Sequence, residues 1–307
     1  MKKCDNLSVC ILVLNEATHI KKCLKSISGW ASEIIVTIDD LTSDETEKIV
    51  RHFTKKVYKI PHKDNFHINK QFTIKKATKP WVFWLDGDEE VSDNLKSEIE
   101  KEINRKTSDH NGYFLPRKNI IFGKWIKDAG WSPDHQLRLF KNDKLRFPCK
   151  RVHEHPVLKG SAGYLKEPLI HYNYQRVSQF IEKMNRYTSV DAVEFVKRFS
   201  PPYWKHFIHR PIDEFIKRFL VWRGYKDGLH GLVLSLLQAA YELVVVAKAW
   251  EMRKFVEEEP DRFIEKTEEK GKNILKTWGW WKKQIQIEES KTIFGKIFFK
   301  ILRRLNL

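Results

Sequence analysis

The sequence predicts an α/β fold: a mostly parallel sheet flanked by helices, followed by a helical C-terminal region. Short apolar runs alternate with helical patterns through the first 90 residues, and this alternation is typical of parallel strands joined by right-handed crossovers. From about residue 177 the apolar residues instead recur at helical spacing. At 307 residues the chain is long enough for one large domain with a helical appendage.

The N-terminal half of the sheet is predicted from four apolar runs and the helical segments between them. The runs give strands at residues 7–14, 34–38, 57–60 and 81–85. The segments between them give helices at residues 19–27, 43–53 and 65–77. The hydroxyl of Ser43 or Thr42 is expected to cap the second helix. Shorter strand-like pieces follow among Gly-, Pro- and Trp-rich loops, at residues 113–116, 136–140 and 169–174.

Two segments of the helical region bear on membrane binding. Residues 230–250 are the most apolar stretch, near the minimum length of a membrane span, but Gln238 and Glu242 lie inside it. This favours a packed or interfacial helix over a spanning one. Residues 291–307 have apolar side chains on one helical face, basic residues largely elsewhere and no acidic residue. Such a helix suits the surface of an anionic membrane, and the alternative is a helix packed on the preceding domain.

The composition indicates a folded, basic protein. A formal net charge of +17 favours an anionic partner: nucleic acid, a nucleotide sugar or an anionic membrane. The 41% hydrophobic and 13% aromatic content excludes a disordered chain. The four cysteines have no metal-like spacing and are expected to be buried and reduced, as in a cytosolic protein. The apolar run near the N-terminus is short and predicts a buried strand rather than a signal peptide.

Acidic residues follow three of the four predicted strands, at the point where each strand ends. The three strand ends carry Asn15-Glu16, Asp39-Asp40 and Asp86-Gly87-Asp88-Glu89. In a parallel sheet, ligands bind beyond the carboxyl ends of the strands. Charges that served only solubility would be scattered over the surface. The sequence therefore predicts one acidic binding edge.

Asp86 and Asp88 are the strongest candidates for a metal site. An entirely apolar strand delivers them two positions apart, and Gly87 allows a tight turn between them. Because alternate residues of a strand point the same way, the two carboxylates can converge. Their hard oxygens suit Mg2+ or Mn2+, which are often shared with substrate phosphates. The alternative is an acidic surface turn that caps a helix at residues 91–103.

Three segments together resemble a family 2 inverting glycosyltransferase with the GT-A fold: LVLNE (12–16), IDDLTSDET (38–46) and WVFWLDGDEE (81–90). The resemblance implies donor contacts from Asn15, Glu16, Asp39, Asp86 and Gly87, with the uridine of a UDP-sugar held by the first three. It implies that Asp88 is the more direct metal ligand. Asp40 and Leu41 depart from the family's usual Ser-Gly.

The resemblance also implies the domain organisation. A GT-A catalytic domain is expected at residues 1–175, with a nucleotide-binding half at 1–90 and an acceptor half at 91–175. The helical spacing after residue 177 predicts a helical C-terminal region at residues 176–307, and the amphipathic pattern of residues 291–307 makes them a candidate membrane-surface helix.

Three downstream segments resemble the lipopolysaccharide-core branch of that family: GWSPDHQLRLF (130–140), RFPCKRVHEH (146–155) and LIHYNYQRVSQFIEKMNRYT (169–188). Members of that branch transfer glucose or a related hexose onto the heptose of lipid-linked acceptors. The resemblance implies a UDP-hexose donor and a lipid-linked glycan acceptor. Another glycan or a protein acceptor stays open.

An inverting transfer needs a base for the acceptor hydroxyl and a Lewis acid for the departing diphosphate. Glu154, in the Val-His-Glu element, is the first candidate for the base and Asp134 the second. Arg138 and Lys70 are candidates for phosphate contacts, because a guanidinium or an ammonium binds phosphate oxygens. His171 is a candidate third metal ligand, and the alternative is a structural histidine.

These observations predict an enzyme that is cytoplasmic and peripherally bound to the inner face of the cell membrane. A nucleic-acid partner is not expected, because carboxylates at three strand ends would repel phosphate unless a cation intervened. A non-catalytic protein that binds nucleotide sugars is the remaining alternative, since only an assay separates binding from turnover. The sequence leaves the oligomeric state open.

Overall fold

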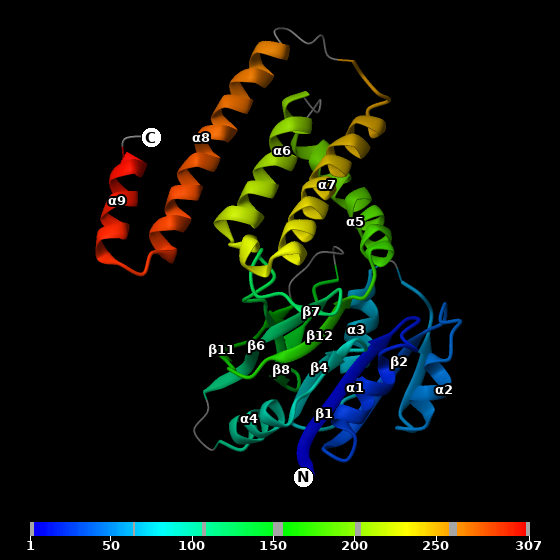
Figure 1. The fold of residues 1–307 in the computed structure, drawn as a ribbon. Coiled ribbons are helices and arrows are strands. Elements are labelled where there is room, and N and C mark those ends of the chain that lie inside the picture. The colour runs from blue at the N-terminus through cyan, green and yellow to red at the C-terminus, as the bar shows by residue number, and fades with distance from the viewer. Residues whose placement is uncertain are drawn as a thin grey trace. The chain divides into compact units, whose positions relative to one another are not determined.

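The computed structural model describes residues 3–63, 65–105, 109–149, 156–199, 204–257 and 263–304. The chain divides into two compact units. Unit 1 consists of Met1–Lys127 and Trp131–Gln175, and unit 2 of Asp128–Gly130 and Arg176–Leu307. Unit 1 combines a sheet with helices, whereas unit 2 is helical (Figure 1).

Ten strands form one sheet in the described part of unit 1. Its first four strands are parallel, in the spatial order β3 (Val57–Ile60), β2 (Ala31–Asp39), β1 (Cys4–Val13) and β4 (Trp81–Asp86). The sheet continues through β8 (His135–Lys141), β6 (His110–Ile121), β12 (Leu169–Tyr174) and β5 (Glu89–Glu90). Two further strands pair with β6, namely β7 (Lys124–Trp125) and β11 (Ser161–Tyr164). A separate two-stranded sheet joins β9 (Leu145–Arg146) and β10 (Val157–Leu158).

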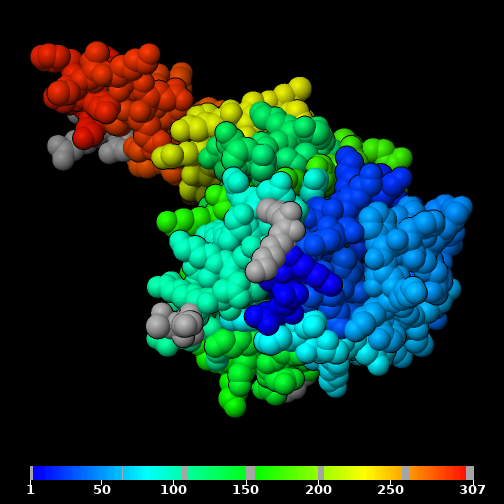
Figure 2. Space-filling view, turned by 90° about the horizontal axis from the view of Figure 1, so that it is seen from below, coloured from blue at the N-terminus to red at the C-terminus, as the bar shows by residue number. Residues whose placement is uncertain are grey.

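The chain segments that carry the first strands lie side by side on one face of unit 1. Figure 2 shows the first residues of β1 in dark blue, with the lighter blue segment that carries β2 and β3 on one side and cyan elements on the other. Both faces of β1 are covered: Val9 and Ile11 belong to one apolar cluster, and Cys10 to another. Because both faces of such a parallel strand are buried, its amino-acid sequence is a continuous apolar run.

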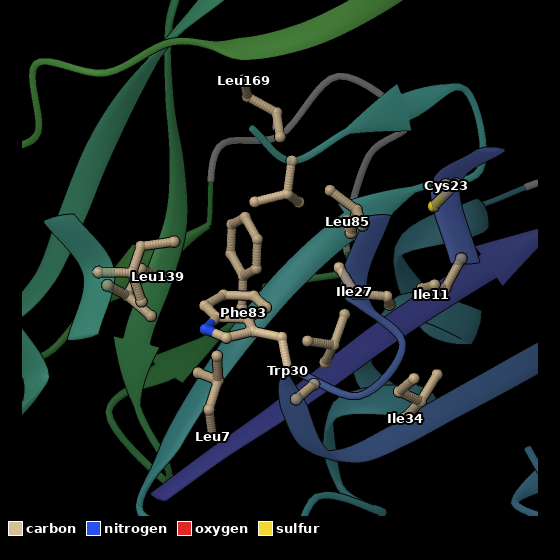
Figure 3. Packing of buried hydrophobic residues seen from close by; sticks show 14 of the residues in the cluster. Leu7, Ile11, Cys23, Ile27, Trp30, Ile34, Phe83, Leu85, Leu139 and Leu169 are labelled. Atoms are coloured by element: carbon tan, nitrogen blue, oxygen red, sulfur yellow. The ribbon is translucent and has the colours of Figure 1, made fainter. Parts of the chain in front are cut away.

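The larger core of unit 1 contains residues of helices α1 (Ile20–Ile27) and α4 (Asp93–Ile103). In α1 the buried residues are those that the apolar spacing marks, Ile20, Cys23, Leu24 and Ile27. Figure 3 shows Phe83 of β4 next to Trp30, and their ring centroids lie 6.5 Å apart at 84°. The Trp30 indole N–H donates to Oε1 of Glu100 at 2.7 Å. Full burial of each large apolar side chain contributes about 1.5–3 kcal/mol, so the core fixes the strands whose ends form the site.

Two local sequence predictions are wrong. Neither Ser43 nor Thr42 caps α2 (Thr46–Arg51), which begins later and has no side-chain cap. The Ser43 N–H instead donates to Oδ1 of Asn15 at 2.9 Å, because this loop is tied to the turn after β1. The strand predicted to end at Pro116 extends to Ile121, since β6 continues past the proline by pairing with β12. The remaining helix of unit 1 is α3 (Phe66–Ile74).

Unit 2 contains the helices α5 (Val177–Arg198), α6 (Trp204–Ile216), α7 (Leu229–Met252), α8 (Phe263–Glu289) and α9 (Ile293–Arg304). A π-helical turn (Lys217–Val221) and a 3-10 turn (Gly224–Asp227) join α6 to α7. Its described core joins α5 to α7 through Ala192, Phe195, Val245, Val246 and Ala249. Glu242, which interrupts the apolar pattern of α7, accepts a hydrogen bond from Nε of Arg210 at 2.8 Å. Within the described ranges, α7 alone is long and apolar enough to cross a membrane, which is weak evidence because core helices share these properties.

The segment Asp128–Gly130 belongs to unit 2 through hydrogen bonds and close packing. The Ala129 N–H donates to the Trp222 carbonyl at 2.7 Å, and the Asp128 N–H donates to Oδ2 of Asp227 at 2.9 Å. Gly130 has a φ of +79°, and a Cβ at this position would lie 2.3 Å from the Trp222 ring. Both the backbone conformation and the missing side chain therefore require glycine.

Gly130→Ala is expected to lower the free energy of unfolding by about 3 kcal/mol. About 1–2 kcal/mol comes from a side chain at positive φ and the rest from the clash with Trp222. Gly123→Ala is the matched control, because Gly123 has a φ of +80° and open space around its absent Cβ. Urea unfolding followed by tryptophan fluorescence measures both variants. Equal losses in the two variants would mean that the Trp222 contact contributes nothing.

Candidate active site

The loop after β2 is tied to the turn after β1. The Ser43 N–H donates to Oδ1 of Asn15, and the Glu16 N–H donates to Oγ1 of Thr46 at 2.8 Å. Asn15 has a φ of +53°, a left-handed conformation that asparagine tolerates better than most residues. Asn15 and Glu16 therefore lie against the loop that begins at Asp39.

Asp39 is nearly buried, with 5% of its surface exposed, at the carboxyl end of β2. Its Oδ1 accepts the Leu41 N–H at 3.1 Å, and its Oδ2 lies 2.9 Å from Nδ1 of His62. The His62 N–H donates to Oδ1 of Asp40 at 2.9 Å. A carboxylate offers about four lone-pair positions, so Asp39 is oriented by these partners and can still accept hydrogen bonds from a ligand.

Gly87 brings the acidic turn after β4 against the end of β1. A Cβ at this glycine would lie 3.0 Å from Cγ1 of Val13 and 3.2 Å from Cγ of Glu16. In the sheet, Leu12 pairs with Asp86 while the neighbouring Val13 pairs with Ile38. Because adjacent strands lie about 4.8 Å apart, the ends of β2 and β4 are separated by about 10 Å with β1 between them. The three acidic strand ends thus share one edge of the sheet.

Asp86 forms the centre of a buried ion-pair cluster. Its Oδ2 pairs with Nη2 of Arg138, and its Oδ1 accepts the Trp84 indole N–H at 3.0 Å. The Lys70 ammonium lies 3.5 Å from Oδ1 and over the Trp84 ring. Burial alone would raise the pKa of Asp86, but the charges of Arg138 and Lys70 hold it well below its usual range. Burial lowers the pKa of Lys70.

Glu89 extends this cluster and was not singled out from the sequence. It is 1% exposed, its Oε1 lies 2.7 Å from Nη2 of Arg138, and its Oε2 accepts the Asp86 N–H at 2.8 Å. A guanidinium nitrogen of Arg117 lies 3.8 Å away. Burial raises the pKa of Glu89, and Arg138 opposes this effect. Arg138 thus holds the carboxylates of β4 and β5 together.

Asp88 faces His171 across the sheet end. Oδ2 of Asp88 lies 3.5 Å from Nε2 of His171, and the Asp88 carbonyl accepts the Tyr172 N–H at 3.0 Å. In the part of the chain that the structure describes, no group of three or more His, Cys, Asp or Glu side chains is arranged to hold a metal ion. Asp88 and His171 thus face each other as a pair of one carboxylate and one imidazole.

Asp134, which precedes β8, is held by several donors. Its Oδ2 accepts from Nε of Arg117 at 2.8 Å and from Nδ2 of Asn119 at 3.1 Å. Its Oδ1 accepts from Nε2 of Gln136 at 2.7 Å. Burial would raise the pKa of Asp134, but Arg117 and the hydrogen bonds lower it. Asp134 is thus an oriented carboxylate at neutral pH.

A cavity of about 540 Å3 opens beside these groups within unit 1. Lys70, Asp86, Arg117 and Arg138 line its polar side. Its other walls are largely aromatic and apolar, and include Phe66, Trp84, Phe114, Phe140 and Phe147. A wall of this kind packs against sugar rings, and the charged side suits a phosphorylated ligand.

The structure gathers most of the predicted site residues in unit 1, and their roles stay predictions. Glu154, the first candidate for the base, lies outside the described residues. Four further residues of the site were not predicted from the sequence: Glu89, Arg117, Asn119 and His62. Glu89 belongs to the visible acidic run after β4, whereas the other three carry no signal in the sequence, because strands or loops distant along the chain bring them to the site.

The family model described as Glycosyl transferase family 2 matches residues 8–173, more than half of the chain. The chain belongs to glycosyltransferase family 2. The matched range contains the whole acidic edge, from Asn15 to Glu89, and also His171. The resemblance inferred from the motifs, the GT-A type of α/β fold and the enzyme class are thereby confirmed.

Curated relatives of this glycosyltransferase cover most of its length. It is 25% identical over 252 residues to the lipopolysaccharide core biosynthesis glycosyltransferase LpsC of Rhizobium meliloti (strain 1021), with 80% of this chain and 92% of that protein covered. It is 24% identical over 256 residues to an uncharacterized glycosyltransferase of Rickettsia bellii (strain RML369-C), with 80% and 86% covered. A crystal structure of S. aureus TarS 1–349 matches at 14% identity and a TM-score of 0.38, over 83% of this chain and 92% of that one.

Family membership makes a nucleotide sugar the donor and a glycan the acceptor of this glycosyltransferase. The buried charges of unit 1 lie at the carboxyl ends of parallel strands, the edge at which α/β sheets generally bind ligands.

Proposed function

We propose that this glycosyltransferase moves a hexose, with inversion, from a UDP-sugar to a lipid-linked glycan such as the heptose of a lipopolysaccharide core. The observation that carries the proposal is the single acidic edge formed by the ends of β1, β2 and β4. The similarity to LpsC, which extends over 92% of that protein, supports the class of acceptor. The catalytic domain is proposed to span residues 1–175, with a helical region after it.

The donor is proposed to lie along this edge. Asp39 accepts hydrogen bonds from the uridine, next to Asn15 and Glu16, and its carboxylate is already oriented by His62. Gly87 is proposed to lie beside the diphosphate, in a turn that packs against Val13 and Glu16 because it carries no side chain. Lys70 and Arg138 are proposed to face the diphosphate, and Asp86 holds both in place.

A divalent cation, Mg2+ or Mn2+, fits Asp88 and His171. Mg2+ is usually bound by one or two protein ligands together with substrate phosphates and water, and Mn2+ accepts carboxylate and imidazole ligands. Asp86 fits this role less well, because Arg138, Lys70 and Trp84 already engage its two oxygens. When bound, the cation would neutralise charge on the departing diphosphate.

The acceptor hydroxyl needs a base on the other side of the sugar. Glu154 is proposed for this role, with Asp134 as the alternative. Asp134 is ionised and fixed, but its low pKa and its donors make it a weak base in the state described. Glu154→Gln and Asp134→Asn separate the two, because loss of the base reduces turnover by about 10²–10⁴-fold and leaves donor binding intact.

A donor assay tests the proposal. The protein is incubated with Mn2+ and a panel of UDP-hexoses, and released UDP is measured with and without an acceptor extracted from lipopolysaccharide. We expect UDP release from one donor, increased by the acceptor, and a product whose anomeric configuration is inverted by NMR. A retained configuration, or turnover that chelation of the metal leaves unchanged, contradicts the proposed mechanism.

We further propose that the enzyme binds the cytoplasmic face of the membrane through α9. Five apolar side chains on this helix are strongly exposed, at Ile293, Phe294, Ile297, Phe298 and Ile301, whereas Phe299 is half-buried. Lys296 and Lys300 lie exposed among them. Bulky apolar groups beside lysines favour an anionic bilayer, with about 1 kcal/mol for each basic residue near the surface.

Deletion of residues 291–307 is expected to reduce binding to vesicles that contain anionic phospholipid by at least about 10-fold. The deletion removes the exposed apolar face and five basic residues, each worth about 1 kcal/mol. Cosedimentation measures binding, with zwitterionic vesicles as the lipid control. UDP binding by the truncated protein shows that unit 1 is intact. Undiminished sedimentation of the truncated protein contradicts a role of α9 in membrane binding.

A further inference from the structure

The side chain of Asn119 connects two residues of the site. Asn119 lies on β6 and is 0% exposed, and the parallel register of β6 and β12 places it opposite His171. Its amide lies within hydrogen-bond distance of both His171 and Asp134. A fully buried amide between two charged or polar groups is costly unless each of its atoms is satisfied.

The orientation of this amide is fixed by its partners. Nδ2 of Asn119 lies 2.8 Å from the Trp131 carbonyl oxygen and 3.1 Å from Oδ2 of Asp134. A carbonyl oxygen and an ionised carboxylate can only accept, so the NH2 group has to face them. The Asn119 carbonyl oxygen, Oδ1, then faces Nδ1 of His171 at 2.6 Å.

The amide in turn determines where His171 carries its proton. Because Oδ1 of Asn119 can only accept, Nδ1 of His171 has to donate. In the neutral imidazole the lone pair then lies on Nε2, the nitrogen that is 3.5 Å from Oδ2 of Asp88. The opposite tautomer would place two lone pairs against each other at 2.6 Å.

We infer that Asn119 is a positioning residue that holds His171 in its Nδ1–H tautomer, with the Nε2 lone pair turned toward Asp88, and restrains Asp134 with the same amide. A cation binds the unprotonated nitrogen of an imidazole. In this tautomer that nitrogen is Nε2 of His171, next to the carboxylate of Asp88. The use of the tautomer rests on the proposed metal-dependent transfer. The tautomer itself does not depend on that function.

Nitrogen NMR of the metal-free and donor-free wild-type protein gives the first test. Histidine is labelled with 15N, spectra are recorded at about pH 8, above the ordinary histidine pKa, and His171→Asn identifies the signal among the 12 histidines. We expect the chemical-shift pattern of the Nδ1–H tautomer for His171. A pattern of the Nε2–H tautomer overturns the inference, whatever the enzyme transfers.

Two substitutions of Asn119 separate its contact with His171 from its contact with Asp134. Asn119→Ala removes the acceptor for His171 and the donor for Asp134, whereas Asn119→Asp keeps an acceptor for His171 and removes the donor. We expect a shift toward the Nε2–H tautomer in the alanine variant and the wild-type tautomer in the aspartate variant. An alanine variant that keeps the wild-type tautomer overturns the inference, and the wild-type spectrum remains decisive if that variant does not fold.

Metal titration gives the functional readout. The Mn2+ concentration that half-saturates UDP binding is expected to rise by about 10–100-fold in Asn119→Ala, the usual effect of removing an outer partner of a metal ligand. Asn142→Ala is the matched control, since the Asn142 amide donates to the Ala77 and Lys79 carbonyls and contacts none of the site residues discussed. An equal rise in both variants contradicts the positioning role. If UDP binding by the wild type does not depend on Mn2+, the proposed metal site is contradicted. The inference about the His171 tautomer is not affected by that result.

Discussion

Asp88→Asn is expected to lower the rate of UDP release from the donor by about 10³-fold or more at saturating Mn2+. The substitution keeps the size of the side chain and removes the charge that is proposed to bind the cation beside His171. Lewis-acid stabilisation of the leaving diphosphate contributes several kcal/mol to the transition state, and each 1.4 kcal/mol corresponds to tenfold in rate. A coupled assay for UDP measures the effect, with Mn2+ varied over several decades.

Asp93→Asn is the matched control for Asp88→Asn. Asp93 is an aspartate at the start of α4 whose side chain is 78% exposed and pairs with Lys96, so its loss changes the net charge equally without reaching the site. The control is expected to turn over at the wild-type rate. Unchanged activity of Asp88→Asn, or an unchanged Mn2+ requirement at a lower rate, would show that Asp88 does not hold the metal.

The fold and the acidic edge were predictable because their determinants are local. Apolar runs predict the parallel strands, and residues directly after a run have to lie at its carboxyl end. The sequence alone therefore predicts Asn15, Asp39 and Asp86 on one edge of the sheet. The ends of β1 and β4 could not be predicted to touch, because this contact depends on the packing of Gly87 against Val13 and Glu16.

The ion-pair and hydrogen-bond partners of the site could not be predicted, because they lie on strands whose pairing no local sequence pattern indicates. Arg138 reaches Asp86 only because β8 pairs antiparallel with β4, and Asn119 reaches His171 only because β6 pairs parallel with β12. The strand that carries Asn119 was predicted to end at Pro116. A strand that stops there would not include Asn119, and the connection between His171 and Asp134 would be missed.

The ion-pair cluster explains how a basic protein keeps four carboxylates next to a negatively charged donor. Asp86 and Glu89 are compensated by Arg138, and Asp134 by Arg117. Asp88 faces a histidine, which is neutral when it carries a single proton. Asp88, which faces His171, is the carboxylate proposed to receive the cation.

Arg138→Met is expected to lower the free energy of unfolding at pH 7 by about 3–5 kcal/mol. Methionine retains much of the apolar stem but leaves Asp86 and Glu89 without the cation that lies between them, and removal of one partner from a buried ion pair typically costs this amount. Arg105→Met is the matched control, because Arg105 is 61% exposed and its nearest oxygen on Glu102 is 3.7 Å away. A surface pair of this kind contributes about 0–1 kcal/mol. Equal losses of unfolding free energy in Arg138→Met and Arg105→Met would contradict the conclusion that Arg138 stabilises Asp86 and Glu89.

The pH dependence of the stability of Arg138→Met distinguishes the loss of charge compensation from the loss of packing. In the folded wild type the pKa of Asp86 lies well below its usual range, which burial would raise but Arg138 and Lys70 lower. A carboxyl group with a lowered folded-state pKa stabilises the protein above its unfolded-state pKa of about 3.9, and this stabilisation is lost as the pH falls through the folded-state value. The difference in unfolding free energy between wild type and Arg138→Met is therefore expected to shrink as the pH falls from the folded-state pKa of Asp86 in the variant toward its lower folded-state pKa in the wild type, because a protonated Asp86 in the variant no longer needs a cationic partner. A difference that stays constant between pH 7 and pH 3 in urea unfolding would assign the loss to packing alone, and the acidic edge would then need another source of charge compensation.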